Sequence, residues 1–168
     1  MRRPSLLVPL GGIVATVGIH LPIVRIEFQV PGARIPVVSD VVDAIPEQSF
    51  GASADQRAYL LGVLALAVAA WVLPRAAPRL NVVGWGLAVA AAGVTGLGAA
   101  RGWIVATRGP GSLRNNDSGF LERSALDFFD RLHDSGVLLI HPAAGLWTLT
   151  AAAVVLVVAL LVPLLSRS

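Results

Sequence analysis

Histidine and carboxylate side chains are the groups in this sequence that could do chemistry. His20 lies near the end of the first apolar run, His141 lies just before the last one, and His133 stands beside Asp134 in the polar segment that precedes it. Two or three imidazoles brought together could hold a metal ion. However, no HxxH, HxH or HExxH spacing is present, and histidines bonded to backbone or water at a membrane interface are the interpretation we favour. We therefore expect neither a metal nor another cofactor.

The apolar runs of the sequence contain no ionisable residue in their central parts. A buried carboxylate or a pair of carboxylates there would be typical of proton-coupled transport or intramembrane catalysis. No Ser-His-Asp order and no phosphate-binding glycine loop occurs either. The absence of cysteine excludes disulfides, thiolate metal sites and thiol redox chemistry. We expect a protein that is not an enzyme.

The composition indicates that lipid surrounds most of this chain. Hydrophobic residues make up 55% of it, charged residues only 14%, and the mean hydropathy is +0.75. Four apolar runs approach the ~20 residues that a helix needs to cross hydrocarbon. These runs are residues 5–24, 58–73, 80–100 and 142–165. We predict a single membrane domain over residues 1–168: an all-α, antiparallel bundle of four transmembrane helices.

The distribution of charge predicts how this bundle is oriented. All ten acidic residues lie between positions 27 and 55 or between 117 and 134, whereas both ends of the chain and the turn at 74–79 carry only arginine. The positive-inside rule then places both termini and this turn in the cytoplasm. All thirteen basic residues are arginine, which is typical of high-GC bacteria, so we expect the bacterial inner (plasma) membrane. The net charge of +3 forms no basic stripe, and we expect no nucleic-acid partner.

The external segment at residues 25–57 contains a strand pattern. Its apolar positions alternate with polar ones, and Pro31-Gly32 suits the centre of a type II turn. Ile35 and Val37 can form a second strand, with Pro36 marking it as an edge. We therefore predict a β-hairpin, which needs a cover because an isolated ribbon is marginal in water.

The external segment at residues 101–141 is predicted to supply this cover. Residues 101–116 have no apolar period and are expected to form a loop. Apolar residues then recur on one side of an amphipathic helix that Gly136 can end. Hairpin and helix would form a small external cap, with contacts from Ile26, Phe28, Val30, Leu121, Phe128, Phe129 and Leu132. An alternative is that membrane lipid or another hydrophobic ligand binds beneath this cap, along Phe28, Phe128 and Phe129.

Small residues repeat every four positions along the run at 80–100. They are Gly84, Ala88, Ala92, Gly96 and Ala100. A row of small side chains lets another helix approach closely, which gives dispersion contacts that lipid cannot match. The row predicts a helix contact, either with a partner protein or within the bundle itself.

The layout of four spans with a stranded first external loop and a helical second one resembles claudin-like membrane proteins. The claudin cysteine pair is absent, and the triplet Gly145-Leu146-Trp147 lies in the last apolar run instead of the first loop. The lysine-free composition, the alanine-rich runs and the hairpin sequence RIEFQVPGARIP resemble small four-helix accessory subunits that associate with Mce-type lipid uptake transporters of high-GC bacteria. That resemblance implies a non-catalytic, stabilising role in a larger inner-membrane complex for lipid import.

Overall fold

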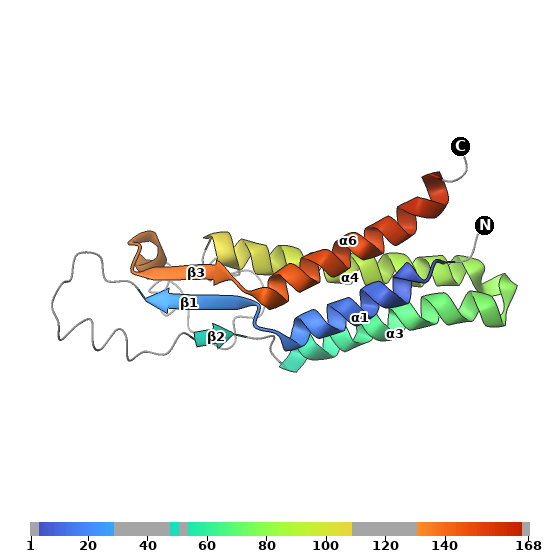
Figure 1. The fold of residues 1–168 in the computed structure, drawn as a ribbon. Helices are drawn as coiled ribbons and strands as arrows, with labels where there is room; N and C mark the ends of the chain where they lie inside the picture. The colour runs from blue at the N-terminus through green and yellow to red at the C-terminus, as the bar shows by residue number, and fades with distance from the viewer. Residues whose placement is uncertain (1–3, 29–47, 51–53, 109–130, 166–168) are drawn as a thin grey trace.

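The computed structural model describes residues 4–28, 48–50, 54–108 and 131–165. This part of the chain is mostly helical, and its four long helices run alternately up and down in one elongated bundle (Figure 1). They are α1 (Leu7–His20), α3 (Ala54–Ala76), α4 (Asn81–Arg108) and α6 (Ala144–Leu165), and a short 3-10 turn, η1 (Pro78–Leu80), precedes α4. Both termini lie at the end of the bundle that carries η1.

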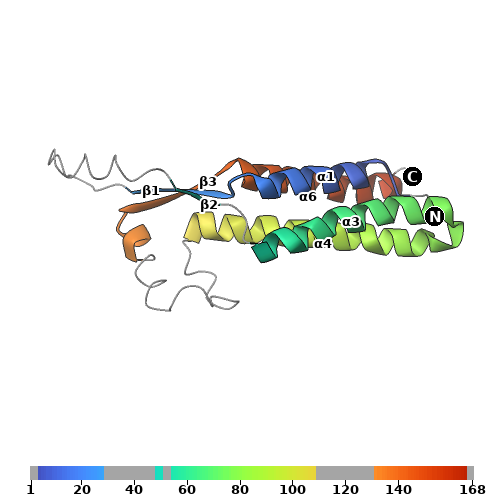
Figure 2. The same cartoon turned by 90° about the horizontal axis from the view of Figure 1, so that it is seen from below.

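The helices pack in two layers. Figure 2 shows α1 beside α6 in one layer, above α3 and α4 in the other. Each helix contacts the one beside it and one in the other layer, so the order around the bundle is α1, α3, α4, α6.

A three-stranded antiparallel sheet lies at the end opposite the termini (Figure 1). Its strands are β1 (Val24–Phe28), β2 (Gln48–Phe50) and β3 (Leu138–Pro142), in the order β2-β1-β3. Val24 lies opposite Phe50 on one side and opposite Pro142 on the other. In β3, Leu138 and Ile140 are buried, and the strand contacts α4.

The first helix is shorter than predicted. We expected helix over residues 5–24, but α1 ends at His20 and Val24 already belongs to β1. Leu21 is extended, with φ −89° and ψ 156°, because the proline ring at position 22 disfavours helical geometry in the residue before it.

The predicted ends of the next two helices, at residues 73 and 100, were also wrong. The turn expected at residues 74–79 begins later, because Pro74 lies inside α3, which runs on to Ala76. The loop expected at 101–116 is helical as far as Arg108. Apolar contacts explain this extension, since Gly102 packs against Leu146 of α6 and Ala106 is buried. The last helix begins at Ala144 instead of residue 142.

The predicted strand at the start of the hairpin is present as β1, but the pairing differs from a two-stranded ribbon. β1 is the central strand, and β3, a segment for which no strand was predicted, occupies one of its edges. The second hairpin strand, with Ile35 and Val37, lies outside the described residues, as does most of the predicted amphipathic helix. The end of that helix is described: Gly136 has φ +73°, and Val137 N–H bonds to Leu132 O while Gly136 N–H bonds to His133 O. This pair of bonds ends the helix at the predicted glycine.

Candidate membrane and partner interface

The described surface of the bundle is apolar on all four helices. Large hydrophobic side chains that are exposed occur on α1, α3, α4 and α6. They include Leu10, Ile13 and Val17 of α1; Leu61 and Val68 of α3; Val82, Val89 and Leu97 of α4; and Val154, Val157 and Leu161 of α6. Two helical segments, Pro78–Arg108 and Ala144–Val162, are long and apolar enough to cross a membrane, and Leu7–His20 and Leu61–Ala76 are shorter apolar helices.

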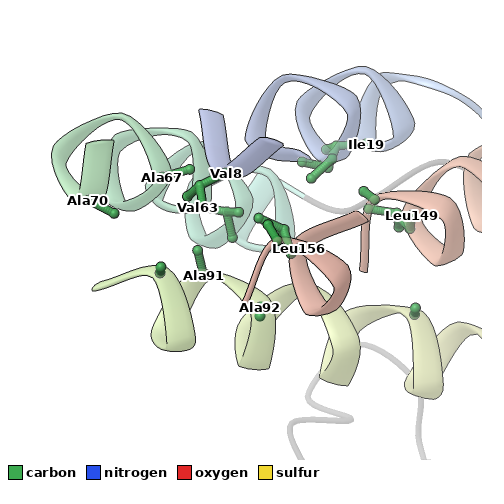
Figure 3. Close-up of a cluster of buried hydrophobic side chains, with 14 residues drawn as sticks. Val8, Ile19, Val63, Ala67, Ala70, Ala91, Ala92, Leu149 and Leu156 are labelled. Carbon is green, nitrogen blue, oxygen red and sulfur yellow. The ribbon is translucent and has the colours of Figure 1, made fainter. Parts of the chain in front are cut away.

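The interior of the bundle is built mainly from small side chains. Figure 3 shows the buried cluster where the four helices meet, with Leu156 near Ala91 and Ala92 and with Leu149 near Ile19. Water-soluble bundles bury leucine and isoleucine and expose charge, because the hydrophobic effect drives their association. Here alanine is the most frequent buried residue, and many valine and leucine side chains are exposed. This distribution is the one expected when close helix contact, not removal of apolar surface from water, holds the helices together.

The predicted row of small residues on α4 divides into two parts. Gly84, Ala88 and Ala92 are buried within the bundle, whereas Gly96 is half-buried with open space around it and Ala100 is exposed. The reason is geometric, since four residues turn a helix by about 400°, so a repeat of four drifts by about 40° at each step. The first half of the row therefore packs internally, and the second half turns outward.

A second row of residues, four of them small, faces outward from α4. Exposed positions recur at alternating steps of four and three, the heptad spacing of two packed helices. They are Gly86, Ala90, Gly93, Leu97, Ala100 and Ile104, which we call the outer α4 face. A Cβ added at Gly86 or Gly93 would meet nothing within 4 Å. Nothing in the described bundle therefore requires glycine at these two positions.

Close helix contacts are also made by glycines of α1, which the sequence reasoning missed. A Cβ at Gly11 would lie 2.7 Å from Leu156 Cγ, and one at Gly12 would lie 2.7 Å from Ala67 Cβ. Gly18 faces Leu149 of α6 in the same way, with 3.1 Å to its backbone nitrogen. The spacing of Gly11, Ala15 and Gly18 on one helix face was the signal that could have revealed this contact.

The start of α6 is joined to the end of α1 by backbone hydrogen bonds. Gly145 N–H donates to Pro22 O over 2.7 Å, and Ala143 N–H donates to Ile23 O over 3.0 Å. These bonds continue the β1–β3 ladder into the helices. They also satisfy donors of the first turn of α6 that have no partner within the helix.

A pair of tryptophans links α4 to α6 near the sheet. The rings of Trp103 and Trp147 meet edge to face with centroids 4.9 Å apart, and Trp103 Nε1–H donates to Thr150 Oγ1 over 3.0 Å. Trp147 is nevertheless 57% exposed. It packs on Trp103 and leaves one side of its ring at the surface.

Arg75 occupies a defined position at the opposite end. Its guanidinium lies 4.1 Å from the centre of the Trp71 ring and donates to Trp71 O over 2.6 Å and to Pro4 O over 3.4 Å. Nearby, Ser5 Oγ and Trp71 Nε1 are buried without a hydrogen-bond partner among the described residues.

The structure describes only part of the predicted external cap. Ile26 and Leu132 are half-buried, and Ile26 pairs with Ile140 in the sheet. For Phe28 the structure describes only the backbone, which lies opposite Leu138 in the sheet. The remaining predicted contacts, Val30, Leu121, Phe128 and Phe129, lie outside the described residues, and so does the proposed lipid space beneath them.

The histidines are each placed separately. His20 and His141 are exposed, His141 pairs with Arg25 in the sheet, and His133 Nδ1 lies 3.1 Å from Leu138 O. Within the described ranges, no three His, Cys, Asp or Glu side chains form a group that could hold a metal ion.

With this geometry established, the chain can be compared with known proteins. No family model, curated protein or solved structure matches it. The assignment of function therefore depends on the arrangement of the surface and core described above.

Proposed function

We propose that this chain is an integral protein of the bacterial plasma membrane and a non-catalytic accessory subunit of a larger membrane complex. In this proposal all four helices span the membrane, with both termini in the cytoplasm. The two helices that meet the length and hydropathy expected of a span, α4 and α6, support it. The exposed valine and leucine side chains of α1 and α3 extend the same apolar surface around the bundle.

The short α1 fits this proposal if the residues that follow it complete the crossing. Its 14 residues rise about 21 Å at 1.5 Å per residue, less than the ~30 Å of hydrocarbon. Residues 21–23 continue from it toward the sheet, and α6 lies along its side. The antiparallel order also brings both termini and η1 to one end, the end whose described residues carry Arg75 and Arg79 but no acid. That charge distribution supports the cytoplasmic assignment.

The outer α4 face is the observation on which the accessory role rests. Glycine costs helix stability relative to larger residues, and lipid tails gain nothing from its presence. Gly86 and Gly93 have open space where a side chain would be, so the bundle itself does not require them. Their heptad spacing with Ala90, Leu97 and Ala100 matches a second helix packed in the membrane. We propose that this helix belongs to a partner protein, and the sequence resemblance suggests an Mce-type lipid uptake transporter.

The test is a pull-down of the tagged native protein in mild detergent, with co-purifying proteins identified by mass spectrometry. We expect a large membrane complex with wild type and its loss with Gly93→Leu. Gly62→Leu on α3 is the matched control, because a Cβ there also meets nothing within 4 Å. Equal recovery of the partner with both variants would refute the outer α4 face as the docking site, and recovery of this chain alone would refute the accessory role.

A further inference from the structure

The bundle end that carries η1 contains a cation and two buried donors that the proposed partner contact does not use. Arg75 is held in place by its contact with the Trp71 ring and by two backbone carbonyls. A guanidinium has five N–H donors, and these two bonds leave others available. Its position is therefore fixed without its hydrogen-bonding capacity being used up.

No carboxylate among the described residues lies at this end. The acidic residues in the described ranges are Glu27, Asp55 and Asp134, and all are at the sheet end. Asp55 is on the same helix as Arg75 but twenty residues away, about 30 Å at 1.5 Å per residue. Arg79, exposed in η1, adds a second positive charge at this end.

Two polar atoms beside Arg75 are buried without a hydrogen-bond partner in the described part of the chain. Ser5 adjoins Pro4, whose carbonyl accepts from Arg75, and its Oγ does not cap α1. Trp71 Nε1 belongs to the ring on which Arg75 stacks. A buried donor without an acceptor is destabilising by about 1–3 kcal/mol, so such atoms usually have a partner.

The geometry points to a phosphate site formed by Arg75, Trp71 and Ser5, with Arg79 at its rim. The oxygens of one phosphate supply acceptors for the Ser5 hydroxyl and the Trp71 indole N–H. Their negative charge pairs with the Arg75 guanidinium. This site rests on the proposed membrane location. If the bundle spans the membrane, the end of its apolar surface lies at the level of the phospholipid headgroups. The ligand is then the phosphate of an anionic phospholipid, and free phosphate is the other source of the same chemistry.

The experiment measures lipid retained by the purified full-length protein in neutral detergent, using native mass spectrometry. Phosphatidylglycerol is compared with diacylglycerol of the same acyl chains, which lacks phosphate, and with inorganic phosphate. We expect phosphatidylglycerol to be retained and Arg75→Gln to weaken its retention about tenfold or more, as the loss of a charge-assisted hydrogen bond does. Arg108→Gln, an exposed arginine at the other end of α4, is the control and should retain lipid like wild type.

Two further variants separate a binding site from atoms that merely lack partners. Trp71→Phe keeps an aromatic ring but removes Nε1–H, and Ser5→Ala removes the hydroxyl. If no ligand binds, neither variant should change retention, and Ser5→Ala should leave thermal stability equal or higher because a buried unsatisfied group has been removed. In the proposed site both weaken retention of phosphatidylglycerol. Displacement of the lipid by millimolar inorganic phosphate would support the site and identify free phosphate as its ligand.

Equal retention of phosphatidylglycerol and diacylglycerol, or equal losses with Arg75→Gln and Arg108→Gln, would overturn the phosphate site. The membrane proposal is measured separately, by whether each variant stays in the membrane pellet after alkaline carbonate extraction. Wild type in the soluble fraction would refute the membrane location, whereas an inserted Arg75→Gln with unchanged lipid retention would refute this site alone.

Discussion

Gly145 lies at the point where α6 begins, and its N–H donates to the carbonyl oxygen of Pro22 over 2.7 Å. A Cβ at Gly145 would lie 2.7 Å from each of three carbonyl oxygens, those of Gly18, Leu21 and Pro22. The start of α6 therefore meets the carbonyl end of α1, an arrangement that the dipoles of both helices favour. This contact fixes the sheet to the bundle, because both partners continue directly into β1 and β3.

Replacement of Gly145 by alanine should destabilise the protein by about 3 kcal/mol, the upper part of the range for overpacked sites. The obstacles are backbone oxygens that cannot rotate away. Thermal unfolding in detergent, followed by circular dichroism, measures the effect. Gly86→Ala is the matched control, because a Cβ there is unobstructed and alanine favours helix. A midpoint for Gly145→Ala at or above that of the control would contradict the close approach.

Gly11→Ala should cost less than Gly145→Ala, about 1 kcal/mol. The atoms in its way are Cγ and Cδ2 of Leu156, the end of a flexible side chain. Leu156→Ala in the same chain removes those atoms, so the two substitutions together should cost less than the sum of the single ones. Strict additivity in this double-mutant cycle would show that the two residues do not interact.

Gly84 and Pro74 form a second pair that can be tested by compensation. A Cβ at Gly84 would collide with the Pro74 ring and lie 2.8 Å from Ala70 O, so Gly84→Ala should destabilise by about 1–3 kcal/mol. Pro74→Ala removes the ring, and it should recover part of the loss in the double variant. Chemical unfolding of the single and double variants gives the coupling, and no recovery would assign the loss to Ala70 O alone.

The Trp103–Thr150 hydrogen bond predicts a measurable coupling between α4 and α6. Trp103→Phe removes the donor but keeps an aromatic ring against Trp147, and it should cost about 1 kcal/mol. In the background of Thr150→Val, which lacks the acceptor, the same change should cost clearly less. Equal costs in the two backgrounds would mean that the bond contributes nothing to stability.

The lack of native cysteine allows the proposed orientation to be measured directly. Ala76→Cys at the end of α3 and Ser135→Cys before β3 are exposed and lie at opposite ends of the bundle. A membrane-impermeant maleimide applied to intact spheroplasts should label Ser135→Cys only, and Ala76→Cys should react after lysis. The reverse pattern would invert the orientation, and labelling of both positions in intact cells would contradict the four-span arrangement.

Local sequence signals determined several features correctly. Alternation at Val24 to Phe28 predicted β1, and Gly136 ends a helix because it adopts a positive φ that other residues avoid. The proline at position 22, which the sequence reasoning did not use, sets the end of α1. These features depend on a few neighbouring residues, so the sequence alone is sufficient to predict them.

Tertiary structure alone decided which face of each helix is buried and which strand pairs with β1. In this chain both the interior and the surface of the bundle are apolar, so hydropathy does not distinguish them as it does in water-soluble proteins. Only close contact does, and it places Gly84 inside and Gly93 outside although both are glycines of one helix. Likewise, β3 is a strand because β1 offers it hydrogen-bonding groups across more than a hundred residues of chain, a partner that no local pattern reveals.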